Sequence, residues 1–70
     1  MRWSGPQPRG EMHIIDEGAR WVKVEFRGKP VGYLERVPGG FRVSDVKNAT
    51  VWDRKLDAVF DICARKGGER

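Results

Sequence analysis

The sequence has very few of the residues that cross-link small proteins. It contains one cysteine, Cys63, and one histidine, His13, among 70 residues. A single cysteine cannot form an internal disulfide, and these two residues alone provide too few ligands for a structural metal site. A lone thiol is typical of a reducing compartment. The composition therefore excludes a disulfide scaffold and argues against a Cys/His metal centre.

Patterns that support catalysis are also lacking. Ser4 and Ser44 have no base near them in the sequence, and His13 lies in an expected strand. No glycine spacing typical of a phosphate-binding loop falls between a strand and a helix. Cys63 lies on the apolar side of an expected helix, where a thiol behaves as a small hydrophobic group. We expect a protein that is not an enzyme, with no catalytic residues, cofactor or metal.

Long apolar runs are missing as well. No stretch approaches the roughly 20 apolar residues that a membrane-spanning helix needs. The start of the chain has no apolar segment of the kind found in secretory signals. The sequence therefore predicts a cytoplasmic protein with no membrane partner.

The basic charge that the chain does carry lies at its two ends. The formal net charge is +4 and the pI is about 9.7. Residues 1–10 and 64–70 each carry a net charge of +2, whereas residues 11–63 hold nine basic and nine acidic side chains. A high pI favours a nucleic-acid partner, but the neutral middle of the chain does not. The basic residues of the ends are Arg2, Arg9, Arg65, Lys66 and Arg70.

Four segments have the pattern of β-strands. In the clearest one, Val22, Val24 and Phe26 alternate with polar or aromatic residues, as in a strand with one buried face. Glycines and prolines form the expected turns between segments. The expected strands span residues 12–15, 20–27, 31–37 and 41–46.

The expected turns suggest a register for the sheet. A three-residue loop at 28–30 would place Lys23 opposite Glu35 and Trp21 opposite Val37, both favourable cross-strand pairs. A two-residue Gly-Gly loop at 39–40 suits the twist of a hairpin. The buried face would then hold Val22, Val24, Phe26, Leu34, Phe41 and Val43. The opposite face would hold Trp21, Lys23, Glu25, Arg27, Val31, Tyr33, Glu35, Val37 and Arg42.

The C-terminal part predicts one helix over roughly residues 51–66. Its apolar residues recur at helical spacing and form one face. Thr50 is the expected N-cap, with Asp53 completing a short capping box. Basic residues suit the last turn, and Gly67 is the expected stop. The expected buried face of the helix consists of Trp52, Leu56, Val59, Phe60 and Cys63.

These elements predict an α+β fold: an antiparallel meander of three or four strands, followed by one C-terminal helix packed on one sheet face. The prolines and glycines of residues 1–10 predict a flexible basic N-terminal tail. Residues 11–66 form the expected domain and residues 67–70 a C-terminal tail. Trp3 either folds back onto the domain or waits for a partner.

The sheet face that the helix does not cover is the candidate binding site. Aromatic residues mixed with arginine are typical of interface hot spots, and a face without a helix must meet water, the tail or a partner. Coverage by the Trp3 tail or the first strand is the alternative to a binding surface. The residues expected to contact a partner are Trp21, Lys23, Arg27, Tyr33, Glu35 and Arg42. Further contacts are expected from the tails through Arg2, Trp3, Arg9, Arg65 and Lys66.

Two classes of partner suit this face. Mixed charge favours a protein partner, because complementary charges give specificity. The alternative is DNA or RNA, because a three-stranded sheet with a helix resembles the sheet-reading DNA-binding domains of plant AP2 factors and of phage integrase arm-binding modules. Glu25 and Glu35 would repel phosphate on such a face. The side chains that this resemblance implies as phosphate and base contacts are Arg20, Trp21, Arg27, Tyr33, Arg36 and Arg42. A homodimer through the same face is left open.

One further resemblance concerns the context of the protein. Strand and turn signals run from Trp21-Val22-Lys23-Val24 through Gly28-Lys29-Pro30-Val31-Gly32-Tyr33-Leu34 and Gly39-Gly40-Phe41 to the helix. Over residues 20–66 the chain thereby resembles small accessory proteins of phages and prophages. The resemblance implies a protein that binds and redirects a host machine without catalysis, such as a regulator of host RNA polymerase or an anti-CRISPR inhibitor. The implied location is the host cytoplasm.

Overall fold

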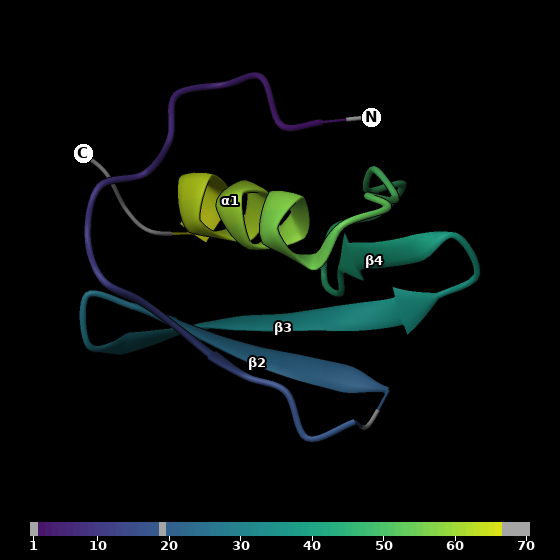
Figure 1. Cartoon of the computed structure of the whole chain (residues 1–70), viewed down its shortest axis with the longest axis horizontal. Helices are drawn as coiled ribbons and strands as arrows, with labels where there is room; N and C mark the ends of the chain where they lie inside the picture. The colour runs from purple at the N-terminus through teal and green to yellow at the C-terminus, as the bar shows by residue number, and fades with distance from the viewer. Residues whose placement is uncertain (1, 19, 67–70) are drawn as a thin grey trace.

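The computed structural model describes residues 2–18 and 20–66 and consists of one antiparallel sheet and one helix (Figure 1). The strand order is β1-β2-β3-β4, which is a simple meander. The α+β class and the C-terminal helix on one sheet face are therefore confirmed. The elements are β1 (Met12–Ile15), β2 (Trp21–Phe26), β3 (Lys29–Val37), β4 (Gly40–Val43) and α1 (Lys55–Lys66). The expected C-terminal tail, 67–70, including the stop at Gly67, lies outside the described residues.

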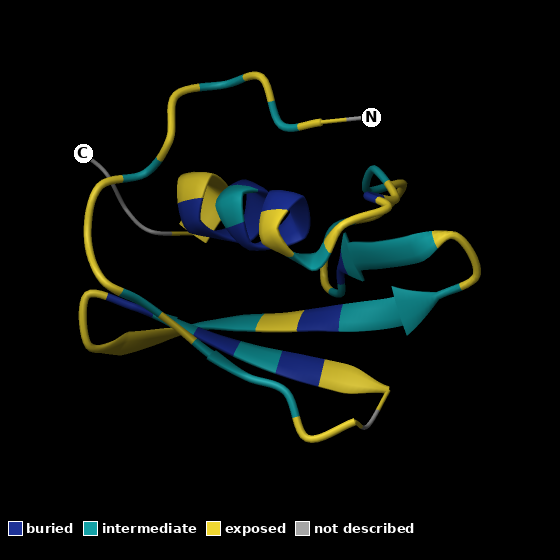
Figure 2. Ribbon diagram, in the orientation of Figure 1, coloured by how far each residue is buried: buried dark blue, intermediate teal, exposed yellow. Residues whose placement is uncertain are grey.

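The core lies between the helix and one face of the sheet (Figure 2). Along β2, buried residues alternate with more exposed ones, as the period of two in the sequence predicts. Val22 pairs with Leu34, and Leu34 pairs with Val43, so these buried side chains line up across three strands. The helix contributes further fully buried residues, which include Ala58, Val59 and Ile62.

The turn between β2 and β3 is shorter than expected, and the predicted register is therefore wrong. Phe26 pairs with Lys29, which leaves Arg27 and Gly28 as a two-residue turn. Both have positive φ, 56° and 79°, as in a type I′ hairpin turn. The loop does not span residues 28–30, and β3 begins at Lys29.

The shorter turn changes the cross-strand partners of β2. Trp21 lies opposite Glu35 rather than Val37, and Lys23 lies opposite Tyr33 rather than Glu35. A bulge between Val24 and Glu25 shifts the pairing of β2 and β3 by one residue, because Glu25 pairs with Pro30 whereas Val24 pairs with Gly32. As a result, Val22 and its partner Leu34 lie on the same face of the sheet.

The extra residue of the bulge is Val31. Its side chain packs against the core, so its expected place on the opposite face is wrong.

The turn between β3 and β4 is displaced by one residue. Val37 pairs with Gly40, so the turn residues are Pro38 and Gly39 rather than Gly39 and Gly40. Phe41 and Val43 still lie on the face of Leu34, as expected, because Arg36 pairs with Phe41 and Leu34 with Val43.

The helix begins later than its apolar pattern predicts. The backbone N–H of Trp52 donates to the carbonyl of Phe41 at 2.7 Å, and the N–H of Phe41 donates to the carbonyl of Trp52 at 2.8 Å. This bridge holds Trp52 against β4 and keeps it out of the helix. Thr50 therefore cannot cap a helix that starts at Lys55, and the expected Thr50–Asp53 capping box is wrong.

The later start also changes the buried helix face. Val59 and Cys63 are buried as expected, but Leu56 is 51% exposed. Phe60 is only partly buried, and Trp52 is buried from outside the helix. Ala58 and Ile62 take the central positions instead. The expected set of helix core residues is thus correct only in part.

Residues 2–10, the strap, run along the side of α1 that faces away from the sheet (Figure 1). The Trp3 ring meets the Trp52 ring edge-on, with centroids 5.9 Å apart. The Trp3 backbone N–H donates to Asp57 Oδ1 at 3.0 Å. At the other end of the strap, the Arg27 guanidinium donates to the Arg9 carbonyl at 2.8 and 2.6 Å. Trp3 therefore folds back onto the protein, and it does so on the helix rather than on the uncovered sheet face.

Candidate interaction surface

The sheet face opposite α1, the open face, has no described element packed over it (Figure 1). The strand register places one set of side chains on it. Trp21, Glu35 and Arg42 form one row across β2, β3 and β4, and Lys23 and Tyr33 lie in the next row. The open face consists of His13, Ile15, Trp21, Lys23, Glu25, Tyr33, Glu35, Val37 and Arg42.

Two aromatic side chains dominate this face. Trp21 is 46% exposed and Tyr33 is 48% exposed. They border a shallow hollow of about 220 Å³, which is also lined by Ile15, Glu17 and Lys23. A half-exposed aromatic ring offers a large apolar area to a partner and loses little side-chain entropy when it is buried. The hollow gives such a partner a place to insert a side chain.

The charges of the open face are paired within the protein. Arg42 donates to Glu35 Oε1 from Nε at 3.1 Å and from Nη2 at 2.9 Å, and the Arg20 Nε atom lies 3.5 Å from Glu35 Oε2. The Glu35 side chain is consequently only 14% exposed. Because both oxygens of its carboxylate face arginine, Glu35 presents little free negative charge to solvent.

Glu25 is paired more loosely at the β1 side of the face. Its carboxylate lies 3.8 Å from Lys23 Nζ and 3.6 Å from His13 Nδ1. With Lys23 and Arg42 as cations and Glu25 and Glu35 as anions, the strands present a balanced set of charges. Arg20, just before β2, adds one further cation.

The structure separates the predicted site residues into two groups. Trp21, Lys23, Tyr33, Glu35 and Arg42 share the open face as expected. Arg27 does not, because its turn conformation directs the guanidinium to the strap and over the Phe26 ring at 5.2 Å.

The expected tail contacts lie away from the open face. The strap carries Trp3 and Arg9 past α1, so one flat partner cannot cover both the strap and the open face. Arg65 donates to Asp61 at 2.7 Å, and Lys66 pairs with Asp45. Arg2 lies in the exposed first part of the strap.

Sequence reasoning missed Ile15 and His13 as members of the open face. Their alternation with Met12 and Ile14 was visible in the sequence, but the partner strand was not. The register shows that His13 lies opposite Glu25 and Ile15 opposite Lys23. Glu17, from the following turn, also reaches the hollow beside Trp21.

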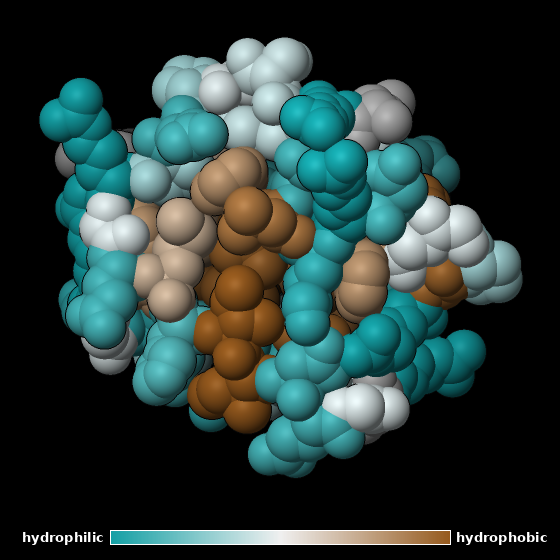
Figure 3. Space-filling model, viewed as in Figure 1, coloured by the Kyte–Doolittle hydropathy of each residue, from teal (hydrophilic) through white to brown (hydrophobic). Residues whose placement is uncertain are grey.

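A second apolar area is exposed on the side of the molecule. Figure 3 shows apolar atoms gathered in a band over the middle of this side, flanked by hydrophilic surface. Leu56 and Val51 are the exposed large aliphatic residues, at 51% and 43%. Neither belongs to the open face.

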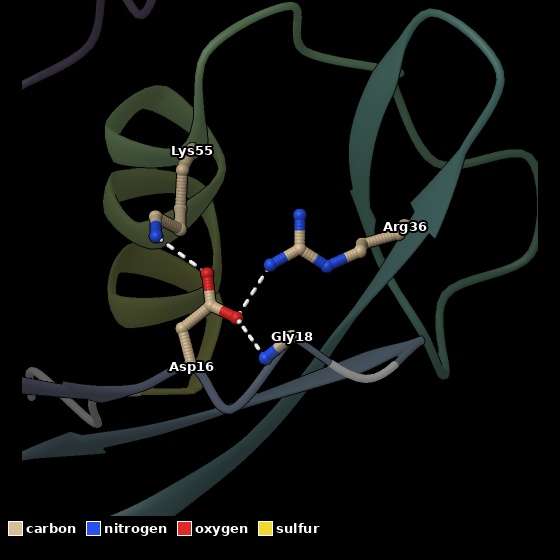
Figure 4. A network of polar contacts seen from close by, with 4 residues as sticks. All are labelled: Asp16, Gly18, Arg36 and Lys55. Atoms are coloured by element: carbon tan, nitrogen blue, oxygen red, sulfur yellow. Dashed lines mark hydrogen bonds and ion pairs between the residues drawn. The ribbon is translucent and has the colours of Figure 1, made fainter.

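A cluster of charges joins the helix to the sheet at one end (Figure 4). Lys55 Nζ donates to Asp16 Oδ2 at 2.6 Å, the Gly18 N–H donates to Oδ1 at 3.0 Å, and Arg36 pairs with Oδ1. The Lys55 hydrogen bond, followed by those of Gly18 and Arg36, holds the pKa of Asp16 well below its usual range. The cluster therefore fixes the start of α1 relative to β3.

The Cys63 thiol, which could in principle act as a nucleophile or a metal ligand, is buried in the core. Burial raises the pKa of the Cys63 thiol to about 11, so it stays protonated near neutral pH. Among residues 2–18 and 20–66, no three metal-ligating side chains gather in one place. Within the same ranges, no helix is long and apolar enough to cross a membrane.

The fold and the surface together define the class: a small α+β protein with a helix on one sheet face and an aromatic, charge-paired surface on the other. No family model, curated protein or solved structure matches the chain.

Proposed function

We propose that the protein is a small non-enzymatic modulator that binds a protein partner through the open face. The observation that carries the proposal is the exposure of Trp21 and Tyr33 around a hollow on an uncovered sheet. Tryptophan and tyrosine are enriched among the few residues that supply most of the energy of protein interfaces. Burying both rings would supply the apolar centre of such an interface.

The charge pairs around the aromatic residues support a protein partner over a polyanion. The strands of the open face carry cations and anions in equal number, whereas nucleic-acid interfaces are strongly positive. Arg42 and Glu35 are already held in one geometry by two hydrogen bonds. Such ordered polar side chains lower the entropy lost on binding and favour partners of complementary charge.

The resemblance to phage accessory proteins suggests the kind of partner. We infer a phage-type protein that acts in the host cytoplasm by occupying a surface of a host machine, such as RNA polymerase. The strand and turn pattern of residues 20–66 is the support for this part of the proposal. The basic strap and the basic end of α1 lie away from the open face. They would provide separate contacts, or would attract the partner electrostatically as it approaches.

The test is a capture experiment with the full-length protein in bacterial lysate, with and without nuclease. We expect a protein to be retained in stoichiometric amount after nuclease treatment. The double substitution Trp21→Ala and Tyr33→Ala should abolish its capture while circular dichroism remains unchanged. The matched control is Val51→Ala with Leu56→Ala, which removes exposed apolar side chains elsewhere. Undiminished capture by the first variant, or equal loss with the control, would contradict the proposal.

Nucleic acid is the second candidate, because one observation weakens the main argument against it. Glu35 is covered by Arg20 and Arg42, so its repulsion of phosphate is smaller than the sequence alone predicts. If nucleic acid is the partner, capture should disappear with nuclease, and Glu25→Gln with Glu35→Gln should tighten binding in a salt titration. Unchanged or weaker affinity would count against the sheet as the reading surface. Sedimentation of the protein alone tests the third outcome, a homodimer through the open face.

A further inference from the structure

A cavity of about 360 Å³ lies between the strap, the C-terminal half of α1 and the β2–β3 turn, away from the open face. Its volume falls in the range of roughly 300–1,000 Å³ found for small-molecule sites. We call this cavity the strap pocket. Because it is bounded by a segment far from the helix in sequence, it exists only when the strap is in place.

Most of the lining of the strap pocket is apolar. The strap supplies Pro6 and Pro8, and the domain supplies Phe26, Cys63 and Ala64. The Cys63 thiol is neutral near physiological pH, because burial raises its pKa to about 11. These surfaces favour an aliphatic chain.

The charged residues that line the strap pocket are both basic. Arg9 and Arg27 line it, and no acidic side chain does so among the described residues. The Arg27 guanidinium donates from Nε and Nη2 to the Arg9 carbonyl, at 2.8 and 2.6 Å. A guanidinium has five N–H donors, so further donors remain after these two bonds. This arrangement favours a ligand with one anionic end.

The turn conformation of Arg27 directs its side chain to the strap and the pocket. Arg27 has a φ of 56°, in the left-handed region that glycine and asparagine occupy at lower cost. Arginine in this conformation carries strain, and its side chain holds the strap and borders the pocket.

We propose that the strap pocket binds a small monocarboxylate with an unbranched aliphatic tail. The tail lies among Pro6, Phe26 and Cys63, and the carboxylate faces Arg27 and Arg9. The proposal does not depend on the function of the open face, because the two sites lie on different sides of the molecule and share no lining residue.

The test is an NMR titration of the ¹⁵N-labelled full chain with octanoate. We expect saturable shifts of the amides of Phe26, Arg27, Cys63 and Ala64, with no comparable shifts at Trp21 and Tyr33. Octanol has the same chain length without the charge and should bind about tenfold more weakly, because it lacks the charge-assisted hydrogen bonds.

Three substitutions separate the charge of the pocket from its shape. Arg9→Gln keeps the backbone carbonyl that anchors the strap but removes one cation, and it should weaken octanoate binding about threefold to tenfold. Lys23→Gln removes a cation of the open face and should leave the affinity unchanged. Ala64→Phe should fill the pocket and abolish the shifts, with folding checked by circular dichroism.

Three outcomes would overturn the proposal. The first is the absence of saturable shifts up to millimolar octanoate. The second is equal binding of octanol and octanoate. The third is an effect of Lys23→Gln as large as that of Arg9→Gln, which would indicate a general effect of charge. Capture of a protein by the open face bears on none of these results, so the two proposals can fail separately.

Discussion

The two faces of the sheet carry different kinds of side chain. On the helix side, Val22, Leu34, Val43 and Ile62 are fully buried. On the open face, Trp21 and Tyr33 remain about half exposed, and the charged side chains are partly exposed and paired with one another. A chain of 70 residues has too little apolar surface to build two cores. The comparison teaches that this protein forms its core on one face of the sheet and leaves the other face partly exposed.

The three tryptophans show the same division. Trp52 is 7% exposed and donates from its ring N–H to Asp61 Oδ2 at 2.9 Å. Trp3 rests edge-on against Trp52, and its ring N–H donates to the Pro6 carbonyl at 3.2 Å. Trp21 instead lies on the open face. Of the three, Trp52 and Trp3 therefore pack on the helix side, whereas Trp21 does not.

The contact between the strap and α1 includes a buried polar atom of the helix that lacks a hydrogen-bond partner within the described part of the chain. Asp57 Oδ1 accepts from the Trp3 backbone, but Asp57 Oδ2 is buried without a hydrogen-bond partner among the described residues. A buried polar atom without a partner costs about 1–3 kcal/mol. We expect the strap to open before the core does.

The largest effect on stability should come from Gly40→Ala, which disrupts the backbone bridge between Phe41 of β4 and Trp52. A Cβ atom at Gly40 would lie 1.8 Å from the backbone oxygen of Trp52, and the φ of Gly40 is 145°. The substitution therefore opens the Phe41–Trp52 bridge and should lower the free energy of unfolding by about 3 kcal/mol. Urea denaturation measures the change.

The control is Gly18→Ala, where φ is also positive but a Cβ atom would meet nothing. It should cost about 1 kcal/mol, the usual cost of a left-handed backbone for alanine. Equal losses for the two variants would show that the bridge does not hold the helix layer to the sheet.

A smaller effect is expected from Trp52→Phe, which tests the buried polar contact of the helix side. Phenylalanine removes the N–H that donates to Asp61, a carboxylate that is 3% exposed. The free energy of unfolding should fall by about 2 kcal/mol, because a buried acceptor loses its partner.

The matched substitution on the open face is Trp21→Phe. It should change the stability by less than about 0.5 kcal/mol, as is usual at a surface position. Thermal melts of both variants provide the comparison. A large loss for Trp21→Phe would contradict the division between a structural face and an open face.

The smallest effect concerns pH and the Asp16 cluster that links helix and sheet. The folded-state pKa of Asp16 is depressed, first by Lys55. The stabilisation is therefore present above the unfolded-state pKa of about 3.9, and it is lost as the pH falls below that value towards the folded-state pKa.

The stability difference between the wild type and Asp16→Asn should therefore shrink as the pH is lowered from about 5 to below 3. Urea titrations across this range measure it. Lys55→Gln removes the leading cause of the depression and should reduce the pH dependence in the wild-type Asp16 background. A difference that stays constant with pH would contradict a role for Asp16 ionisation.

The sequence was sufficient for the elements whose pattern is local. The period of two in β2 predicted which of its residues are buried, and the apolar spacing near the C-terminus predicted a helix. Most residues of the open face followed from the same alternation: Trp21, Lys23, Glu25, Tyr33, Glu35, Val37 and Arg42 were all placed correctly. Alternation fixes the face of a side chain even when the partner across the strand is wrong, provided that the error is an even number of residues.

The sequence by itself thus determined the α+β class, the order of the strands along the chain and seven residues of the open face, because these depend on periodicity between near neighbours. Only the tertiary structure decided the start of α1, the direction of Arg27 and the position of the strap. Each depends on a contact between distant residues: Phe41 with Trp52, Arg9 with Arg27, and Trp3 with Asp57, 54 positions apart. Local pattern carries no information about such contacts, because they form only when the chain has packed into layers.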